Sequence, residues 1–318
     1  MKIRIGTRGS TLALWQAYFV RAALLKVEPE MEVEIVKITT KGDMMRRVRL
    51  ATDTSTGLFT KAIELALIEE KVDVAVHSLK DLPTDLVEGL ELGAVPRRED
   101  PADALISRDE MTLDQLPEGA VVLTGSPRRR SQLLGLRPDL EVRPVRGNVP
   151  TRINKMRRGS AHGLVLACAG LARLGMAHVA GERLDPERFV PAAAQGALAV
   201  EFREDDAAAR HLCEAIDDPE SRLAVTAERA FMRSLRAGCR VPAGALARRT
   251  DPGDQLRIIG VVGEPDGSRV LRGEVSQTVE TPPDAAQLGR QLADQLKKQG
   301  CQSILEKVRR AEQHQEGR

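Results

Sequence analysis

The order of apolar runs in the first 80 residues constrains the fold most, because strand-like and helix-like segments alternate there. Residues 2–5, 32–38 and 72–76 read as strands, and residues 10–26 and 58–70 have the spacing of amphipathic helices, the first capped by its Ser10. Strands that alternate with helices pair in parallel through right-handed crossovers. Ligands of such sheets bind beyond the carboxyl ends of the strands, so we expect a ligand site at that edge.

The same order recurs between residues 121 and 167, which predicts a second α/β lobe. Its expected elements are strands at 121–123, 141–145 and 164–167 and helices at 127–136 and 150–158. Charged or proline-containing segments at 95–101 and 190–196 are typical of crossings between two units. We therefore expect two hinged lobes with a central cleft.

The chain beyond residue 217 has a different pattern, which predicts a small α+β domain. Its expected elements are helices at 220–236 and 284–299, strands at 245–248, 256–262 and 270–275, and a hairpin turn at Asp266-Gly267. The polar tail after Glu306 predicts a frayed end. The expected domains are thus residues 1–96 with 196–216 as lobe 1, residues 97–195 as lobe 2, and residues 217–318 as the C-terminal domain.

Composition excludes several classes of protein. Aromatic residues make up only 2%, so stacking platforms for single-stranded nucleic acid are nearly absent. No apolar run approaches the roughly 18 residues of a membrane-spanning helix, and residues 1–6 enter a strand with no secretory h-region. The four cysteines lie far apart without a C-x-x-C pair, which argues against a disulfide framework or a zinc site. We expect a cytoplasmic protein without a metal or a membrane partner.

Arginine outnumbers lysine by 37 to 11, and the guanidinium group is suited to forked binding of carboxylate or phosphate. An arginine-rich or thermophilic background gives the same bias. Residues 126–158 hold ten Lys and Arg against two acids, a net charge of +8. Two turns in this stretch, Ser126–Arg129 and Arg146–Arg152, fall where a strand should end and a helix begin, and free N–H groups there attract anions. The stretch predicts either an anion-binding pocket or a solvated basic surface.

Two further turns carry polar groups directly after expected strands. In His77-Ser78-Leu79-Lys80-Asp81, a partly desolvated carboxylate at Asp81 would suit proton transfer, although Ser78-x-x-Asp81 is also ordinary helix-start chemistry. In Gly6-Thr7-Arg8-Gly9-Ser10, the Arg8 side chain and the Ser10 hydroxyl suit an anion, although Ser10 also fits a plain helix cap. The residues alone leave both alternatives open.

One cysteine stands on a constrained loop, Gly238-Cys239-Arg240-Val241-Pro242. A neighbouring cation lowers the pKa of a thiol and favours the nucleophilic thiolate, whereas a lone cysteine is more often an inert core residue, so both interpretations of Cys239 stay open. Cys168, within an apolar run, is expected to be inert. Since only His77 among the histidines lies in a suggestive place, a Cys–His catalytic pair has no support.

Taken together, these segments resemble the porphobilinogen deaminase family, in family order along nearly the whole chain. The matching stretches are Gly6–Ser10, Leu12–Gln16, Val76–Pro83, Arg98–Pro101, Ser126–Arg129, Arg146–Arg152, Ala169–Gly175, Gln195–Gly196, Thr226–Arg229 and Gly238–Pro242. The resemblance implies a pair of periplasmic-binding-protein-like α/β lobes with a small α+β domain. It also implies a transferase that condenses four porphobilinogen molecules head to tail on a covalent dipyrromethane cofactor, releasing ammonia and finally hydroxymethylbilane by hydrolysis.

The resemblance assigns roles residue by residue. Cys239 matches the cysteine that forms the thioether to dipyrromethane, and Asp81 matches the acid that acts on the pyrrole nitrogens and stabilises the cationic azafulvene. The positions matching the cofactor-binding set are Lys80, Ser126, Arg128, Arg129 and Arg146, and those matching the substrate-binding set are Arg8, Ser10, Arg152 and Arg173. Each pyrrole carries acetate and propionate arms, which explains a demand for guanidinium groups.

The sequence departs from the family at three places. Thr54-Ser55-Thr56 replaces a common Gly-Gly-Lys, so the loop at 41–56 lacks the family lysine; Thr11 replaces a proline, and Ala194 a glycine. One rival interpretation is a non-catalytic anion-binding module, which predicts no adduct on Cys239. Another is a nucleic-acid binder, which predicts steeply salt-dependent binding. We expect porphobilinogen as the small-molecule partner, no nucleic-acid partner, and a monomer.

Overall fold

The computed structural model describes residues 1–39, 60–237, 241–250 and 255–316, with side chains described as far as residue 311. The chain forms two compact units. Unit 1 comprises Met1–Glu99 and Gln195–Arg222, and unit 2 comprises Asp100–Ala194 and Leu223–Arg318. The predicted loop at 41–56 lies outside the described residues, as does Cys239.

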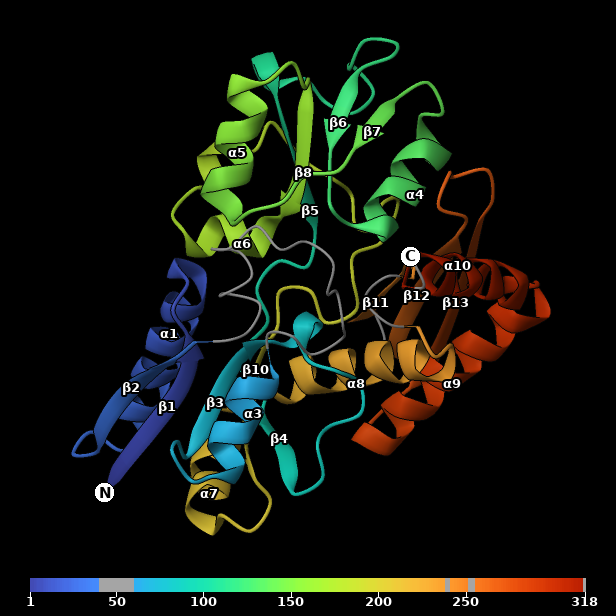
Figure 1. Cartoon of the computed structure of the whole chain (residues 1–318). Helices are drawn as coiled ribbons and strands as arrows, with labels where there is room; N and C mark the ends of the chain where they lie inside the picture. Colours follow the sequence, from blue (N-terminus) through green and yellow to red (C-terminus); the bar gives the residue numbers. More distant parts are fainter. Residues whose placement is uncertain (40–59, 238–240, 251–254, 317–318) are drawn as a thin grey trace. The chain divides into compact units, whose positions relative to one another are not determined.

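Unit 1 is built on a five-stranded sheet of order β2-β1-β3-β10-β4. Its elements are β1 Lys2–Arg8, α1 Thr11–Val27, β2 Glu32–Ile38, α3 Lys61–Ile68, β3 Val74–Ser78, β4 Leu90–Ala94, β10 Leu198–Arg203 and α7 Ala207–Ile216. The strands β2, β1 and β3 pair in parallel, as the alternating pattern predicts, whereas β10 runs antiparallel to both β3 and β4. One apolar cluster lies between the sheet and the helices α1 and α7, and another lies under α3 (Figure 1).

Unit 2 contains a second five-stranded sheet, of order β7-β6-β8-β5-β9. Its elements are β5 Asp103–Ser107, β6 Val121–Leu123, α4 Pro127–Leu136, β7 Glu141–Arg143, α5 Val149–Arg158, β8 Gly163–Ala167, α6 Cys168–Arg173 and β9 Glu182–Arg183. Here β6 is parallel to β7 and β8, and β5 is antiparallel to β8 with Asp103 opposite Ala167. The first residue of β5 therefore lies at the edge where β8 ends and where α4 and α5 begin.

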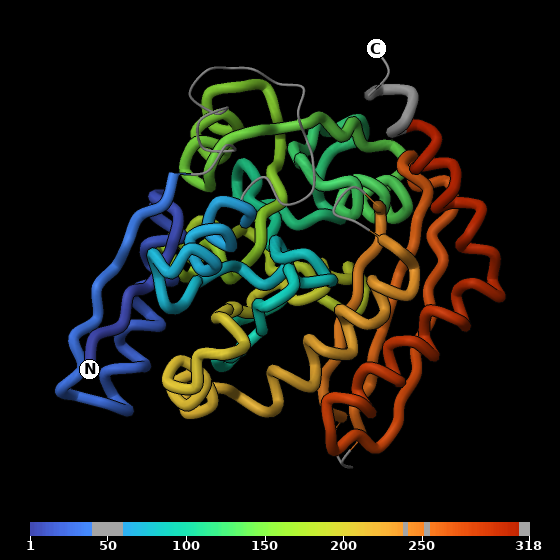
Figure 2. The backbone as a smooth tube through the Cα atoms, turned by 60° about the horizontal axis from the view of Figure 1, so that its bottom comes forward, coloured from blue at the N-terminus to red at the C-terminus, as the bar shows by residue number. Residues whose placement is uncertain are grey.

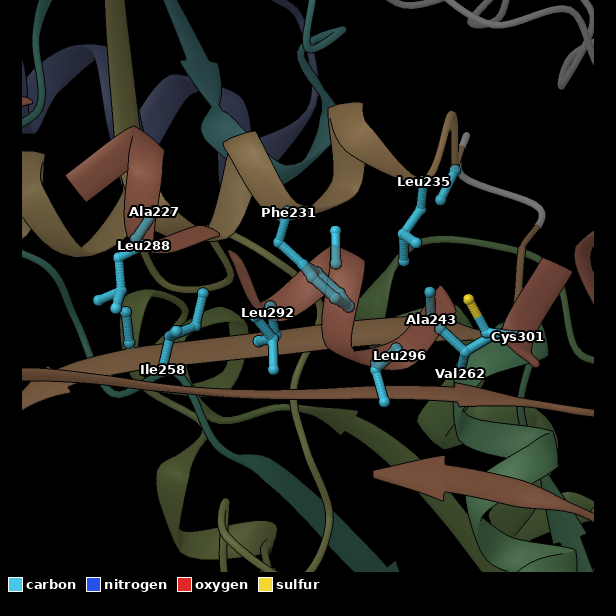
Figure 3. Packing of buried hydrophobic residues seen from close by; sticks show 14 of the residues in the cluster. Ala227, Phe231, Leu235, Ala243, Ile258, Val262, Leu288, Leu292, Leu296 and Cys301 are labelled. Carbon is cyan, nitrogen blue, oxygen red and sulfur yellow. The ribbon is translucent and has the colours of Figure 1, made fainter. Parts of the chain in front are cut away.

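Unit 2 also contains an antiparallel sheet of three strands and its helices. Its elements are α8 Pro219–Ser234, whose first turn belongs to unit 1, and β11 Ala243–Arg249, β12 Gln255–Gly263, β13 Val270–Thr278, α9 Pro282–Lys298 and α10 Cys301–Glu316. Phe231 of α8, Ile258 of β12 and Leu292 of α9 meet in one core (Figure 3). The helices α8 and α9 approach so closely that a Cβ on Gly289 would lie 2.1 Å from the carbonyl oxygen of Ala227.

The predicted α/β class, with a separate α+β region at the C-terminus, is confirmed by these sheets. The hairpin at Asp266-Gly267 is confirmed too, with Gly267 at a φ of 74°. The prediction of a frayed tail after Glu306 is wrong, because α10 continues to Glu316, and the described part of this helix packs against α9 (Figure 2). Its buried Cys301, Ile304 and Val308 recur at helical spacing and anchor it to the core.

Candidate active site

The carboxylate candidate of unit 1 lies on a short turn at the end of a buried strand. The strand β3 ends at Ser78, and a single 3₁₀ turn, Leu79–Asp81, follows. Leu79 is fully buried and its N–H donates to the carbonyl oxygen of Ala197 at 3.0 Å, so it anchors the turn. Asp81 itself is exposed. The expectation of a partly desolvated carboxylate is thus not met in the free protein, because only the turn's first residue points into the core.

Lys80 is held by a segment far away in the sequence. Its Nζ donates to Oε1 of Gln195 at 3.2 Å. Gln195 is buried, and its carbonyl oxygen accepts from Nε of Arg98 at 2.8 Å. The ammonium group therefore has a fixed position beside Asp81, and Gln195 joins the site as a residue whose role the sequence did not reveal.

The turn Gly6–Ser10 of unit 1 places the Ser10 hydroxyl at the start of a helix. Ser10 is the N-cap of α1, and its Oγ accepts from the N–H of Ala13 at 3.3 Å. Arg8 is the last residue of β1 and is half-buried. The cap prediction for Ser10 is confirmed, and its hydroxyl proton remains available to an anion, since the cap uses only the oxygen.

In unit 2 the first basic turn forms a buried ion cluster. Ser126 caps α4 by accepting from the N–H of Arg129 at 3.4 Å, with Pro127 in the first turn. Arg128 and Arg129 are only 4% and 6% exposed, and both bind the carboxylate of the fully buried Asp103. Arg128 Nη2 donates to Oδ2 at 2.7 Å, and Arg129 donates to Oδ1 through Nε at 3.0 Å and Nη2 at 2.6 Å.

Backbone carbonyls complete this cluster. Arg128 Nη1 donates to the carbonyl oxygen of Val190 at 2.7 Å, and Arg129 Nη1 donates to that of Val165 at 2.9 Å. Burial lowers the pKa of Arg128, and the charge of Asp103 opposes that effect. Two guanidinium groups face one carboxylate, so the cluster carries an excess of one positive charge. Among the described residues, the buried Nε of Arg128 has no hydrogen-bond partner.

The second basic turn lies at the same edge of the sheet and is more open. Asn148 caps α5 by accepting from the N–H of Thr151 at 2.9 Å. Arg146 is exposed, and Arg152 is half-buried with its Nε on the carbonyl oxygen of Gly147 at 2.8 Å. Arg173 ends α6 and is buried. Because β6 and β7 are parallel neighbours, the starts of α4 and α5 share one edge of the sheet.

The basic stretch at residues 126–158, with its net charge of +8, is only partly a solvated surface. Arg137 pairs with Asp139 and Arg143 pairs with Glu141, each at 2.6 Å, both in exposed or half-exposed positions. Arg128 and Arg129 have their counter-ion outside the stretch, in Asp103. The exposed Arg146 and the half-buried Arg152 therefore provide cationic groups at this edge beside the buried cluster.

The loop that holds Cys239 lies outside the described residues, but the strand that follows it packs on the arginine cluster. A Cβ on Gly244 of β11 would lie 2.5 Å from the carbonyl oxygen of Pro191 and 2.9 Å from Cδ of Arg128. Only glycine fits so close an approach. The start of β11 is thus fixed against Arg128, within unit 2.

The cysteines that the structure describes are poor nucleophiles. Burial raises the pKa of Cys168 to about 12 and that of Cys213 to about 12, and it also raises that of Cys301. Their thiols stay protonated near neutral pH, which agrees with the inert role expected of Cys168. Over the described ranges, no group of three or more His, Cys, Asp or Glu side chains is arranged to hold a metal ion, and no helix is long and apolar enough to cross a membrane.

Comparison with known families identifies the chain. The family described as "Porphobilinogen deaminase, dipyromethane cofactor binding domain" matches residues 3–211, and "Porphobilinogen deaminase, C-terminal domain" matches residues 222–298. The match over residues 3–211 thus defines an α/β protein that binds a dipyrromethane cofactor. The chain belongs to the porphobilinogen deaminase family. Its activity is that of a hydroxymethylbilane synthase, a transferase of porphyrin biosynthesis that uses porphobilinogen as substrate and dipyrromethane as cofactor.

Several solved structures are also similar to this chain. The methionine binding protein MetQ is 15% identical, with a TM-score of 0.42 over 69% of this chain and 91% of that chain. A probable amino-acid ABC transporter extracellular-binding protein, ytmK from Bacillus subtilis, is 12% identical, with a TM-score of 0.42 over 68% and 90%. An arginine-specific periplasmic binding protein from Salmonella typhimurium is 15% identical, with a TM-score of 0.39 over 69% and 95%.

Proposed function

We propose that this chain carries out the family reaction with Asp81 as the catalytic carboxylate and Cys239 as the residue that attaches the cofactor. The observation that carries the proposal is the family match over residues 3–211 and 222–298, within which Lys80 and Asp81 form the turn at the carboxyl end of β3. Parallel α/β sheets place their ligands at that end.

The residues of unit 2 fit an acidic cofactor. The excess positive charge on Arg128 and Arg129 and the unsatisfied Nε of Arg128 call for one further anion, which a carboxylate arm of a pyrrole supplies. We assign dipyrromethane binding to Lys80, Ser126, Arg128, Arg129 and Arg146. When bound, the cofactor supplies a free pyrrole carbon as the nucleophile for the first condensation.

We assign to Asp81 the stabilisation of positive charge on the substrate ring. A carboxylate accepts the hydrogen bond of a pyrrole N–H and stabilises the positive charge that develops on the ring as ammonia leaves. The neighbouring ammonium of Lys80, held by Gln195, attracts the acid arms of the substrate. Exposure of Asp81 in the free protein leaves room for the substrate to approach, and the ring that binds there displaces water from the carboxylate.

We assign the remaining cationic and hydroxyl groups to the substrate arms, namely Arg8, Ser10, Arg152 and Arg173. We also propose three domains, at residues 1–96 with 196–216, 97–195 and 217–318. Each region has its own sheet and its own apolar cluster, which supports the division. We further propose a cytoplasmic monomer without a nucleic-acid partner, in keeping with a reaction on small, soluble acids.

The test replaces Asp81 by asparagine, which keeps the shape of the side chain and removes its charge. Turnover of porphobilinogen should fall by roughly 10² or more, the usual contribution of a positioned acid or base. The matched control is Asp85→Asn, an exposed acid four residues further along, which should leave turnover unchanged. Near-normal turnover in Asp81→Asn, in protein that carries its cofactor by mass spectrometry, would rule out the proposed role.

A further inference from the structure

Unit 1 buries three titratable side chains together, and the reaction assigned above uses none of them. Glu64 lies on α3, His77 on β3 and Glu201 on β10, and their exposures are 4%, 6% and 0%. His77 Nε2 lies 3.3 Å from Oε2 of Glu201. Burying charged groups is costly unless they compensate one another, so a cluster of this kind needs a reason.

The register between β3 and β10 brings His77 and Glu201 together. His77 pairs with Ala199, and Glu201 pairs with Ala75, so the two charged side chains are diagonal neighbours on the face under α3. The opposite face carries apolar residues such as Val76 and Val200. A slip of one residue would place Glu201 in that apolar cluster, so the charged pair disfavours every such slip.

His77 is the basic residue in contact with Glu201. Among the described residues, neither carboxylate oxygen of Glu201 has a hydrogen bond, and Nε2 of His77 lies 3.3 Å from its Oε2. Burial, followed by the charge of Glu201, raises the pKa of Glu64, which favours its neutral form.

Lys61 on α3 and Arg203 on β10 are further cations on the neighbouring elements. Lys61 is exposed, and its charge opposes the rise in the pKa of Glu64. Arg203 is two residues beyond Glu201 on β10, but its guanidinium binds the carbonyl oxygens of Leu67 and Val72 and the carboxylate of Asp206. Arg203 is therefore committed elsewhere, and His77 is the basic side chain that contacts Glu201.

The same two strands hold the turn that bears Lys80 and Asp81. β3 runs directly into this turn, and the segment leading into β10 binds it twice, through the bond from the Leu79 N–H to Ala197 and that from Lys80 to Gln195. The position of the turn therefore depends on the register of β10 against β3.

We propose that His77 and Glu201 are positioning residues for the Lys80–Asp81 turn: their buried contact, with Glu64 beside it, fixes β10 against β3. This inference rests on the proposed role of Asp81. Loss of either partner should displace the turn that bears Asp81, so the effect should fall on kcat and not on the KM for porphobilinogen.

The test compares His77→Gln, Glu201→Gln and the double variant His77→Gln/Glu201→Gln, each purified with its cofactor. We expect each single variant to lower kcat about tenfold, because it leaves one buried group without its partner, and the double variant to regain most of that loss. KM for porphobilinogen should change little in all three variants, because the pair acts on the position of the turn that bears Asp81. The matched control is Asp73→Asn, which removes the ion pair with Arg4 at the opposite end of β3.

Asp73→Asn should lower the melting temperature and leave kcat unchanged. The inference is overturned if the single variants keep the wild-type kcat, or if the double variant loses as much kcat as the two single variants together. Should a single variant fail to fold, the double variant decides the matter: a kcat within about threefold of the wild type supports the inference, and a loss of about tenfold or more contradicts it. Asp81→Asn, assayed in parallel, separates the outcomes: full turnover there contradicts the proposed function, whereas its loss together with silent His77 and Glu201 variants contradicts this inference only.

Discussion

Replacing Asp103 by asparagine should destabilise unit 2 strongly, because this one carboxylate compensates two buried guanidinium groups. Asp103 is fully buried and accepts three N–H bonds from Arg128 and Arg129, at 2.6 to 3.0 Å. Asparagine keeps one acceptor oxygen and turns an NH₂ group toward a guanidinium donor. Removing one partner of a buried ion pair costs about 3–5 kcal/mol. At about 2–4 °C per kcal/mol, the melting temperature should fall by about 6–20 °C.

The assay is thermal unfolding followed by circular dichroism, with the exposed pair of Asp114 and Arg188 as the control. That pair also joins an aspartate to an arginine in unit 2, at 3.0 Å, but both side chains are about half exposed or more. Solvent weakens such a pair, so Asp114→Asn should lower the melting temperature by only a few degrees. An Asp103→Asn variant as stable as Asp114→Asn would refute the argument that the arginine cluster depends on a buried counter-ion.

Two other substitutions test the packing and electrostatics. Burial and the charge of Glu201 raise the pKa of Glu64. Ionising Glu64 therefore costs stability as the pH rises from the ordinary pKa of a glutamic acid toward the raised pKa of this one. Glu64→Gln removes that cost, so the melting temperature of the variant, relative to that of the wild type, should be higher at about pH 8 than at about pH 5. An equal difference at both values would contradict the shift. Gly289→Ala places a methyl group 2.1 Å from the carbonyl oxygen of Ala227 and should cost about 1–3 kcal/mol in urea unfolding, whereas Gly9→Ala, whose methyl group meets no described atom within 4 Å, should not.

Periodicity was sufficient to predict the parallel parts of both large sheets and the C-terminal meander, but not the antiparallel strands β5 and β10. In β10, Leu198, Val200 and Phe202 alternate with Ala199 and Glu201, which is the pattern of a half-exposed edge strand. Glu201 is nevertheless completely buried, since α3 covers its face and Nε2 of His77 lies 3.3 Å from its carboxylate. No property of a single strand could reveal that partner, because it comes from β3.

The sequence predicted the local parts of the candidate site but not its long-range contacts. Helix-start chemistry at Ser10, Ser126 and Asn148 is local, and all three side chains cap their helices. The partner of Arg128 is 25 residues away on an antiparallel strand, so a count of charges along the basic stretch could not include it. For the same reason Gln195, which lies 115 residues from Lys80, was recognised only as part of a motif.

The attachment of dipyrromethane to Cys239 is tested most directly by the intact mass of the protein purified from a host that makes dipyrromethane. The mass should exceed that of the polypeptide by two linked pyrrole units, and the modified peptide should contain Cys239. Cys239→Ser should lose both the mass increase and the activity. Cys301→Ser, at a buried thiol in the core of unit 2, should retain the increase. A fully active protein at its unmodified mass would contradict the covalent attachment of the cofactor.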